Sequence, residues 1–383
     1  MPYAGALLVA QVLLIGQADR IEGSLLGLER RFDGLQEAAT DYDSFVRPSG
    51  EVRAVMLFAR FPDAEIEETT ESLYDALVPG AVEYYRRASY GRMSLKVDAV
   101  RRWIPMDAAS TTGEYDCSRF ETHKHYLSEV IGKADPEVDF SRYDIVYVAG
   151  SKNPGTPNSP TFRADPGDGI AADGIEMRHA ATFGNDVRND HWGWRVLIHE
   201  TGHVFGLPDL YGYGDRSTHG YVGGWDPMGL VASGCHYLAW HKAKLGWLDD
   251  DQAAVVRDGE STQMLTPIER EGGLKAIVLP FSDEEAYVVE ARSHEMDEAE
   301  EPGVLLYTVS TAAESGHGPV QVIAARPDDD SPQLKPLFAT LYNALFTDGT
   351  VLKDEDRGIE VDIVGRSPEG YTLKVSRMVR PVE

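Results

Sequence analysis

The stretch HETGHVFGLPD, residues 199–209, decides how this 383-residue chain is interpreted. His199 and His203 are four residues apart, so on a helix they lie one turn apart on the same face and both imidazoles can reach one metal ion. Glu200 follows His199 directly, where its carboxylate can approach a water molecule bound to that ion. The HExxH pattern therefore predicts a metal site with a base beside it.

The residues after the second histidine supply a third ligand. Gly206 lies three residues after His203, where a helix can end in a left-handed cap that glycine adopts at little cost. Leu207 and Pro208 then turn the chain, and Asp209 is expected to point back towards the metal. Two neutral imidazoles and one carboxylate suit zinc and leave a coordination position open, as catalytic zinc sites require.

The overall composition excludes some classes of partner. The chain has 63 Asp and Glu against 36 Lys and Arg, which gives a formal net charge of -27. This charge repels phosphate backbones and anionic lipids, so we expect no nucleic-acid partner and no binding to membrane surfaces. Solubility is the simple explanation of the acidity. Structural Ca²⁺ is the alternative, because calcium takes oxygen ligands and residues 151–190 are rich in Asp.

Two further features concern the compartment. The chain has only two cysteines, Cys117 and Cys235, which excludes a disulfide scaffold and a cysteine-ligated zinc, while either one bridge or two free thiols stays open. Residues 6–16, ALLVAQVLLIG, form an apolar run of the length of a signal sequence, with small residues after it but no basic residue before it. We expect a secreted protein, with a buried first element as the alternative. No later run is long enough to span a bilayer, so an integral membrane protein is not expected.

The pattern of apolar residues divides the chain into three parts. Residues 1–45 are expected to form an N-terminal leader with a candidate signal segment. Residues 46–250 alternate strands and helices: strands at 51–61 and 143–150, helical patterns at 69–89 (interrupted at Pro79-Gly80), 118–132, 191–206 and 236–247, and a long surface loop or set of turns in 151–190. Residues 251–383 contain short strands separated by turns, which predicts a mostly antiparallel β-sandwich.

A second motif, WDPMG, lies at residues 225–229, and its Met228 follows Asp209 by 19 positions. HExxHxxGxxD with a later methionine in a tight turn resembles the metzincin clan of zinc endopeptidases, and Met228 matches the methionine that forms a hydrophobic floor beneath the zinc ligands. The segments HETGHVFGLPDLYGYG, WDPMG and HYLAWHKAKLGW, together with VRAVMLFARFPDA and YYRRASYGRMSLKV upstream, resemble the immune inhibitor A family of secreted metallopeptidases. The similarity covers residues 51–250. The resemblance implies a metzincin-like α/β (α+β) catalytic domain before the β-sandwich.

These residues imply a zinc-dependent endopeptidase that acts on proteins or peptides, most simply as a monomer. Zinc held by His199, His203 and Asp209 would lower the pKa of a water molecule, and Glu200 would act as the general base. Two alternatives stay open: a non-catalytic zinc-containing binding protein, and a zinc hydrolase that cleaves a non-peptide bond. The intact Glu200 disfavours the first. The set of Gly206, Asp209 and Met228 disfavours the second.

The remaining polar and aromatic candidates are weaker. Asp215 and His219 are lesser alternatives to Asp209 as third ligand. Tyr221, His236 and Tyr237 are candidate donors to the transition state, although a core or surface role is favoured for each. Packing is also favoured for four aromatic residues: Trp240, Trp247, Tyr211 and Tyr213. His123 and His125 diverge on a helix and cannot share a metal well, and His294 lacks a second histidine.

Overall fold

The computed structural model describes residues 25–28, 35–189, 192–214, 217–293, 302–326 and 341–378. The chain divides into two compact units, one of Thr40–Leu207 and one of Pro208–Glu383 with Met1–Ala39. The sequence predicts a division near residue 250. In the structure, residues 208–250 instead group with the β-rich part and not with the preceding strands and helices. The predicted signal run lies outside the described residues.

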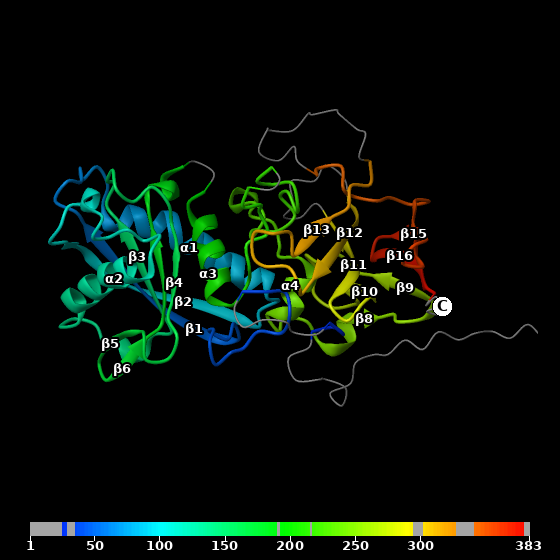
Figure 1. The fold of residues 1–383 in the computed structure, drawn as a ribbon, viewed down its shortest axis with the longest axis horizontal. Helices are drawn as coiled ribbons and strands as arrows, with labels where there is room; N and C mark the ends of the chain where they lie inside the picture. The colour runs from blue at the N-terminus through cyan, green and yellow to red at the C-terminus, as the bar shows by residue number, and fades with distance from the viewer. Residues whose placement is uncertain are drawn as a thin grey trace, which may run out of the picture. The chain divides into compact units, whose positions relative to one another are not determined.

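The unit Thr40–Leu207 is built on a five-stranded sheet (Figure 1). Its strand order is β2 (Met93–Pro105), β1 (Gly50–Arg60), β3 (Ile145–Gly150), β7 (His179–Phe183) and β4 (Thr161–Arg163). The first four strands are parallel, and β4 pairs antiparallel with β7 at one edge. Strand β1 is almost entirely buried, as its run of apolar residues predicts.

Helices cover both faces of this sheet, namely α1 (Thr70–Ala88), α2 (Phe120–Ala134) and α3 (Trp194–Val204). On one face, apolar residues of α2 such as Leu127 and Val130 share a core with Val55 and Val146 of the strands. Because side chains alternate along a strand, Tyr147 points to the other face, where its hydroxyl lies 2.8 Å from Thr201 Oγ1 of α3. Helix α1 packs beside α3 on that face.

The expected break at Pro79-Gly80 is wrong, because α1 runs continuously from Thr70 to Ala88 with Pro79 inside it. A Cβ atom at Gly80 would lie 2.4 Å from the ring of Trp194, the first residue of α3. Tyr85 of α1 also donates a hydrogen bond to the carbonyl of Ile198 (2.9 Å). Gly80 is therefore a point of close contact between the two helices rather than a helix end.

The region expected to be a long loop, residues 151–190, also contains strands. Besides β4 and β7 it forms a hairpin of β5 (Ile170–Ala172) and β6 (Ile175–Met177). The strands have three to five residues, so the surrounding Pro, Gly and Asp residues hide them in the composition. Two of them complete the sheet, so the region belongs to the body of the unit.

In the described part of the other unit there is one α-helix, α4 (Ala239–Lys244), which is shorter than the helical pattern at 236–247. Its first sheet has the order β13 (Val320–Val322), β12 (Gly303–Ser310), β11 (Glu285–Arg292), β10 (Ala276–Pro280) and β8 (Ala253–Val255). Its second sheet has the order β14 (Val351–Asp354), β15 (Ile359–Ser367), β16 (Gly370–Arg377) and β9 (Gly259–Leu265).

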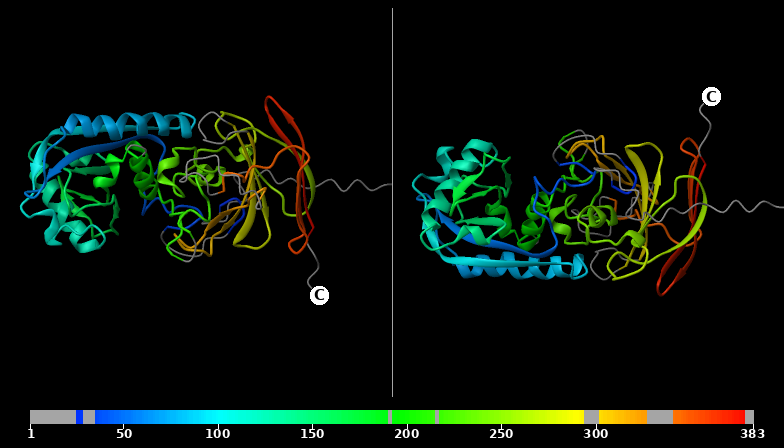
Figure 2. Two further views of the ribbon diagram at one scale, coloured as in Figure 1. Left: turned by 90° about the horizontal axis from the view of Figure 1, so that it is seen from above. Right: turned by 90° about the horizontal axis from the view of Figure 1, so that it is seen from below.

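The two sheets share one apolar core. Val289 of β11 and Leu306 of β12 belong to the same buried cluster as Val361 of β15 and Leu373 of β16. Figure 2 shows β15 and β16 (red) beyond the strands of the first sheet (yellow to orange). All strand pairs in these sheets are antiparallel except β8 with β10. A mixed α/β fold with few helices and several sheets therefore agrees with the α+β layout expected from sequence.

Among the described residues, none of the helices has the length and hydropathy needed to cross a membrane.

Candidate metal centre

Helix α3 carries the HExxH motif and is held rigidly by its neighbours. Its residues Val196, Leu197 and Ile198 are buried, which gives the helix an apolar body beside the motif. Tyr147 from β3 bonds Thr201, in the middle of the motif. Side chains from both the sheet and α1 therefore bond the part of α3 that carries the candidate metal ligands.

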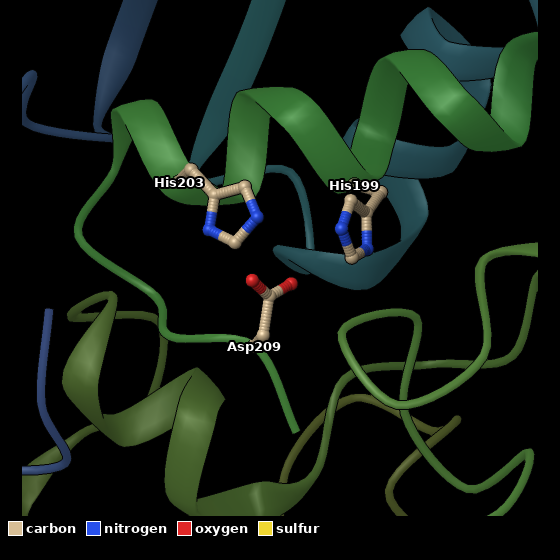
Figure 3. Close-up of side chains that lie close together, drawn as sticks. All are labelled: His199, His203 and Asp209. Atoms are coloured by element: carbon tan, nitrogen blue, oxygen red, sulfur yellow. The ribbon is translucent and has the colours of Figure 1, made fainter. Parts of the chain in front are cut away.

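The structure brings His199, His203 and Asp209 together. One potential ligand atom of each residue lies within 4.8 Å of the corresponding atoms of the other two. In the described part of the chain, no other group of three or more potential ligand residues is this close together. Figure 3 shows both imidazoles pointing from the same side of α3 towards the carboxylate. The centroids of the two rings are 4.8 Å apart, and the rings are nearly perpendicular, with an interplanar angle of 86°. His199 and Asp209 are buried.

The donor set fits zinc. Nδ1 of His203 lies 2.8 Å from the carbonyl oxygen of Leu207. Because a carbonyl only accepts, Nδ1 carries the proton and Nε2 is left with the lone pair that binds metal. Imidazoles oriented by a hydrogen bond at the other nitrogen are usual in zinc sites. Two imidazoles and one carboxylate are also the number and kind of protein ligands found in catalytic zinc sites.

The turn after α3 directs the chain from the histidines to Asp209. Gly206 has a φ of +92°, the left-handed conformation expected at this position. Its N–H donates to the carbonyl of His203 (3.0 Å), and the N–H of Leu207 donates to that of Gly202 (2.9 Å). A Cβ atom at Gly206 would lie 2.7 Å from Thr40 Cγ2. Both backbone conformation and lack of space therefore require glycine here.

Asp209 itself is held by residues close to it in space. The hydroxyl of Tyr213 donates a hydrogen bond to Asp209 Oδ2. The backbone N–H of Asp209 donates to Ser315 Oγ (2.9 Å). Neither contact is predictable from sequence, because packing is the favoured role for Tyr213 and Ser315 lies 106 positions further along the chain.

Glu200, the candidate base, is buried and hydrogen-bonded to the edge strand β4. The hydroxyl oxygen of Thr161 lies 2.8 Å from Glu200 Oε2 and 2.7 Å from the Glu200 carbonyl oxygen. The single hydroxyl proton is therefore shared between two acceptors, one of which is the carboxylate. Sequence reasoning missed Thr161 because it lies in the region expected to be a loop.

Met228 is fully buried in the turn that the sequence singled out. Its carbonyl accepts a hydrogen bond from Leu210, the residue after Asp209 (2.9 Å). Its own N–H donates to Oδ1 of the buried Asp226 (2.8 Å). Asp226 Oδ2 in turn accepts from Leu238 N–H (2.8 Å) at the start of α4. The turn is thus fixed by a buried carboxylate.

His241 of α4 joins Asp226 to a carboxylate from the N-terminal part of the chain. Its Nδ1 lies 2.8 Å from Asp226 Oδ2, and its Nε2 lies 3.0 Å from Glu37 Oε1, with all three side chains fully buried. Burial alone would lower the pKa of His241, but the charges of Asp226 and Glu37 outweigh it and raise the pKa to about 10. His241 is therefore a buried cation between two acids.

Among the described residues, the other histidines singled out from sequence do not belong to the candidate metal site. Nδ1 of His219 lies 3.0 Å from the carbonyl oxygen of Gly229. His123 is buried with Nε2 2.8 Å from Thr182 Oγ1, and burial lowers its pKa to about 4, so it is neutral. Asp215 and His294 lie outside the described residues.

The candidate donors and aromatic residues are mostly buried. Five of them are at most 4% exposed, in agreement with a role in packing, namely Tyr221, His236, Tyr237, Trp240 and Trp247. Tyr213 differs, with 54% of its surface exposed while its hydroxyl bonds Asp209. Cys117 and Cys235 form no disulfide bond. No cluster of acidic side chains suited to calcium occurs among the described residues.

Comparisons with known proteins add no family assignment. Neither the protein-family models nor the curated proteins include a match to this chain.

Proposed function

We propose that this chain is a zinc-dependent endopeptidase with a metzincin-like catalytic part, similar to the immune inhibitor A family. The observation that carries the proposal is the group formed by His199, His203 and Asp209, with Glu200 on the same helix. A purely structural zinc site needs no base next to its ligands. The buried carboxylate of Glu200, oriented by Thr161, therefore favours catalysis over a binding role.

The chemistry follows from the residue types. Zinc bound at this site would polarise a substrate carbonyl and lower the pKa of water. Glu200 would accept the proton of the attacking water and then donate it to the leaving amine, so that one carboxylate serves both steps. His199, His203 and Asp209 would hold the metal, and Met228 is proposed to form the floor of the site. Proteins or peptides are the proposed substrates.

The first prediction concerns Glu200 and tests this function directly. In Glu200→Gln the amide cannot accept a proton, so casein hydrolysis should fall by about 10²- to 10⁴-fold, the usual contribution of a general base. Zinc content, measured by atomic absorption, should match the wild type because Glu200 is not among the ligands. The exposed Glu121→Gln in α2 is the matched control and should retain full activity.

The other possible results of this experiment would either exclude the proposed mechanism or favour one of the two alternative functions. Equal casein hydrolysis by wild type and Glu200→Gln would exclude the proposed mechanism. A wild-type chain that binds zinc but cleaves no protein would favour the non-catalytic binding protein. Hydrolysis of an ester or amide that is not a peptide, with no protein cleavage, would favour the other zinc hydrolase.

A further inference from the structure

A short loop of the β-rich part is hydrogen-bonded to the backbone of Asp209. Residues 314–318, ESGHG, connect β12 to β13. Ser315 Oγ accepts from the backbone N–H of Asp209 (2.9 Å), and the N–H of Gly316 donates to the Asp209 carbonyl (3.0 Å). Both backbone polar groups of one candidate ligand are thus bonded by two successive residues of the loop.

Tyr213 belongs to the same set of contacts. Its backbone N–H donates to the carbonyl of Gly316 (3.0 Å), while its hydroxyl donates to the carboxylate of Asp209. The Tyr213 ring lies directly against Gly316, where a Cβ atom would be 2.3 Å from two ring carbons. Gly316 also has a φ of +75°. The loop therefore needs glycine at this position to place the ring and its hydroxyl.

A second glycine anchors the far end of the loop in a similar way. Gly318 has a φ of +77°, and a Cβ atom there would lie 2.7 Å from the ring of Tyr221. The N–H of Val322 in β13 donates to the carbonyl of Tyr221 (2.8 Å). Because both ends of the loop continue into strands of the first sheet, its position is determined by the sandwich.

Asp209 needs such support because of its place in the chain. It lies five residues after the end of α3 at Val204, beyond the left-handed turn at Gly206, so the helix does not fix its side chain. A carboxylate that rotates freely loses conformational entropy when it binds a metal. A hydrogen bond to one of its oxygens restricts that rotation, as the outer partners of metal ligands commonly do.

We propose that Tyr213 and residues 314–318 are positioning groups that hold Asp209 as the third zinc ligand. The β-rich part of the chain thereby takes part in metal binding instead of only stabilising the fold. This inference rests on the proposed zinc site, and it does not depend on which bond the enzyme cleaves.

The second prediction tests Tyr213 through metal affinity in the full-length chain. Tyr213→Phe keeps the ring and removes the hydroxyl, so the Kd for Zn²⁺, measured by competition with a chromophoric chelator, should rise about 10- to 100-fold. Tyr287→Phe is the matched control, since the Tyr287 hydroxyl donates to the carboxylate of Asp354 (2.8 Å) within the sandwich. Its zinc affinity should equal that of the wild type.

A pair of glycine variants separates positioning of the ring from backbone strain. Gly316→Ala introduces a Cβ atom against the Tyr213 ring at a φ of +75°, whereas Gly272→Ala introduces one at +72° with no atom within 4 Å. Both variants carry a similar backbone cost, and Gly316→Ala adds the clash with the ring, so the metal-free melting temperature should fall in both variants and further in Gly316→Ala. Only Gly316→Ala should weaken zinc binding and alter the visible spectrum of the Co²⁺-substituted protein.

The outcomes distinguish this inference from the proposed function. Wild-type zinc affinity in both Tyr213→Phe and Gly316→Ala would overturn the positioning role. If Gly316→Ala fails to fold, Tyr213→Phe decides alone, because it removes a single oxygen atom. A wild-type chain that binds no zinc would overturn both proposals. Zinc binding without casein hydrolysis would contradict only the endopeptidase.

Discussion

Glu200 illustrates how much depends on a single hydroxyl group. HExxH places the carboxylate one residue after the first histidine, and in the structure the hydroxyl of Thr161 on β4 lies 2.8 Å from its Oε2 and helps to orient it. A base that abstracts a proton from a water molecule must be aimed at that water. Thr161 is therefore expected to affect turnover without binding the metal.

The third prediction follows from this contact. Thr161→Val keeps the shape and removes the hydroxyl. A hydrogen bond to a charged group contributes about 1.5–3 kcal/mol, and because the proton is shared we expect the lower end, about a tenfold fall in kcat. KM for a peptide substrate and zinc content should stay unchanged. Thr161→Ser restores the hydroxyl and should recover kcat, whereas wild-type turnover in Thr161→Val would exclude an orienting role.

At the scale of elements, the position of α3 depends on its contact with α1. Gly80 of α1 lies against the ring of Trp194 at the start of α3, and Tyr85 bonds the carbonyl of Ile198 one residue before the first histidine. The rings of Tyr84 and Trp194 are also 5.9 Å apart. The sequence signal Pro79-Gly80 normally indicates a helix break, but here the glycine allows two helices to approach.

The fourth prediction compares glycines in two helices. Gly80→Ala would raise helix propensity by up to about 1 kcal/mol. Its Cβ would lie 2.4 Å from the Trp194 ring, however, and overpacking costs about 1–3 kcal/mol. Overpacking should win, so the midpoint of urea unfolding should fall. Gly132→Ala in α2, where no atom lies within 4 Å, should leave or raise that midpoint. The same direction of change in both variants would show that contact with Trp194 is not decisive.

At the scale of the whole molecule, buried charges connect segments far apart in sequence. His241 lies between Asp226 and Glu37, and Glu37 is 204 positions before it. The ion pair of Glu290 and Arg292 in β11 is also fully buried (2.6 Å), with Arg292 donating to the carbonyl of Trp225 (2.9 Å). These bonds group residues 208–250 with the sandwich. A boundary near residue 250 is predicted from sequence because a buried ion pair has no distinctive sequence pattern, so these bonds cannot be foreseen.

The fifth prediction is a pH dependence of stability from His241. Its pKa is raised from 6.5 to about 10 on folding by Asp226 and Glu37, against the opposing effect of burial. The stability that the charged imidazole contributes is therefore complete below pH 6.5 and is lost as the pH rises towards 10.

We expect His241→Gln to lower the free energy of unfolding by about 3–5 kcal/mol at pH 6, because it leaves two buried carboxylates without their cation. The difference from wild type, measured by urea unfolding at several pH values, should shrink between pH 7 and 10. The exposed His125→Gln should differ little from wild type at any pH. A difference for His241→Gln that stays constant up to pH 10 would argue against a charged His241.

The sequence by itself determined the local features of the candidate site. Residues four apart on a helix must share a face, and a glycine placed after the helix can adopt the left-handed turn, so His199, His203 and Gly206 were predictable from spacing alone. The apolar runs likewise predicted the central strands β1 and β3 and the β-rich C-terminal part. Zinc binding and peptide cleavage stay predictions.

Only the tertiary structure decided what surrounds that site. Thr161 lies on a three-residue strand, Tyr213 in irregular backbone and Ser315 in a distant loop, and none of these has a periodicity that sequence could reveal. The same holds for Gly80 and for Glu37 beside His241. Contacts between residues distant in sequence arise from chain packing, which local propensity and spacing do not encode. The motif therefore identified the candidate ligands and base, whereas packing determined which side chains orient them.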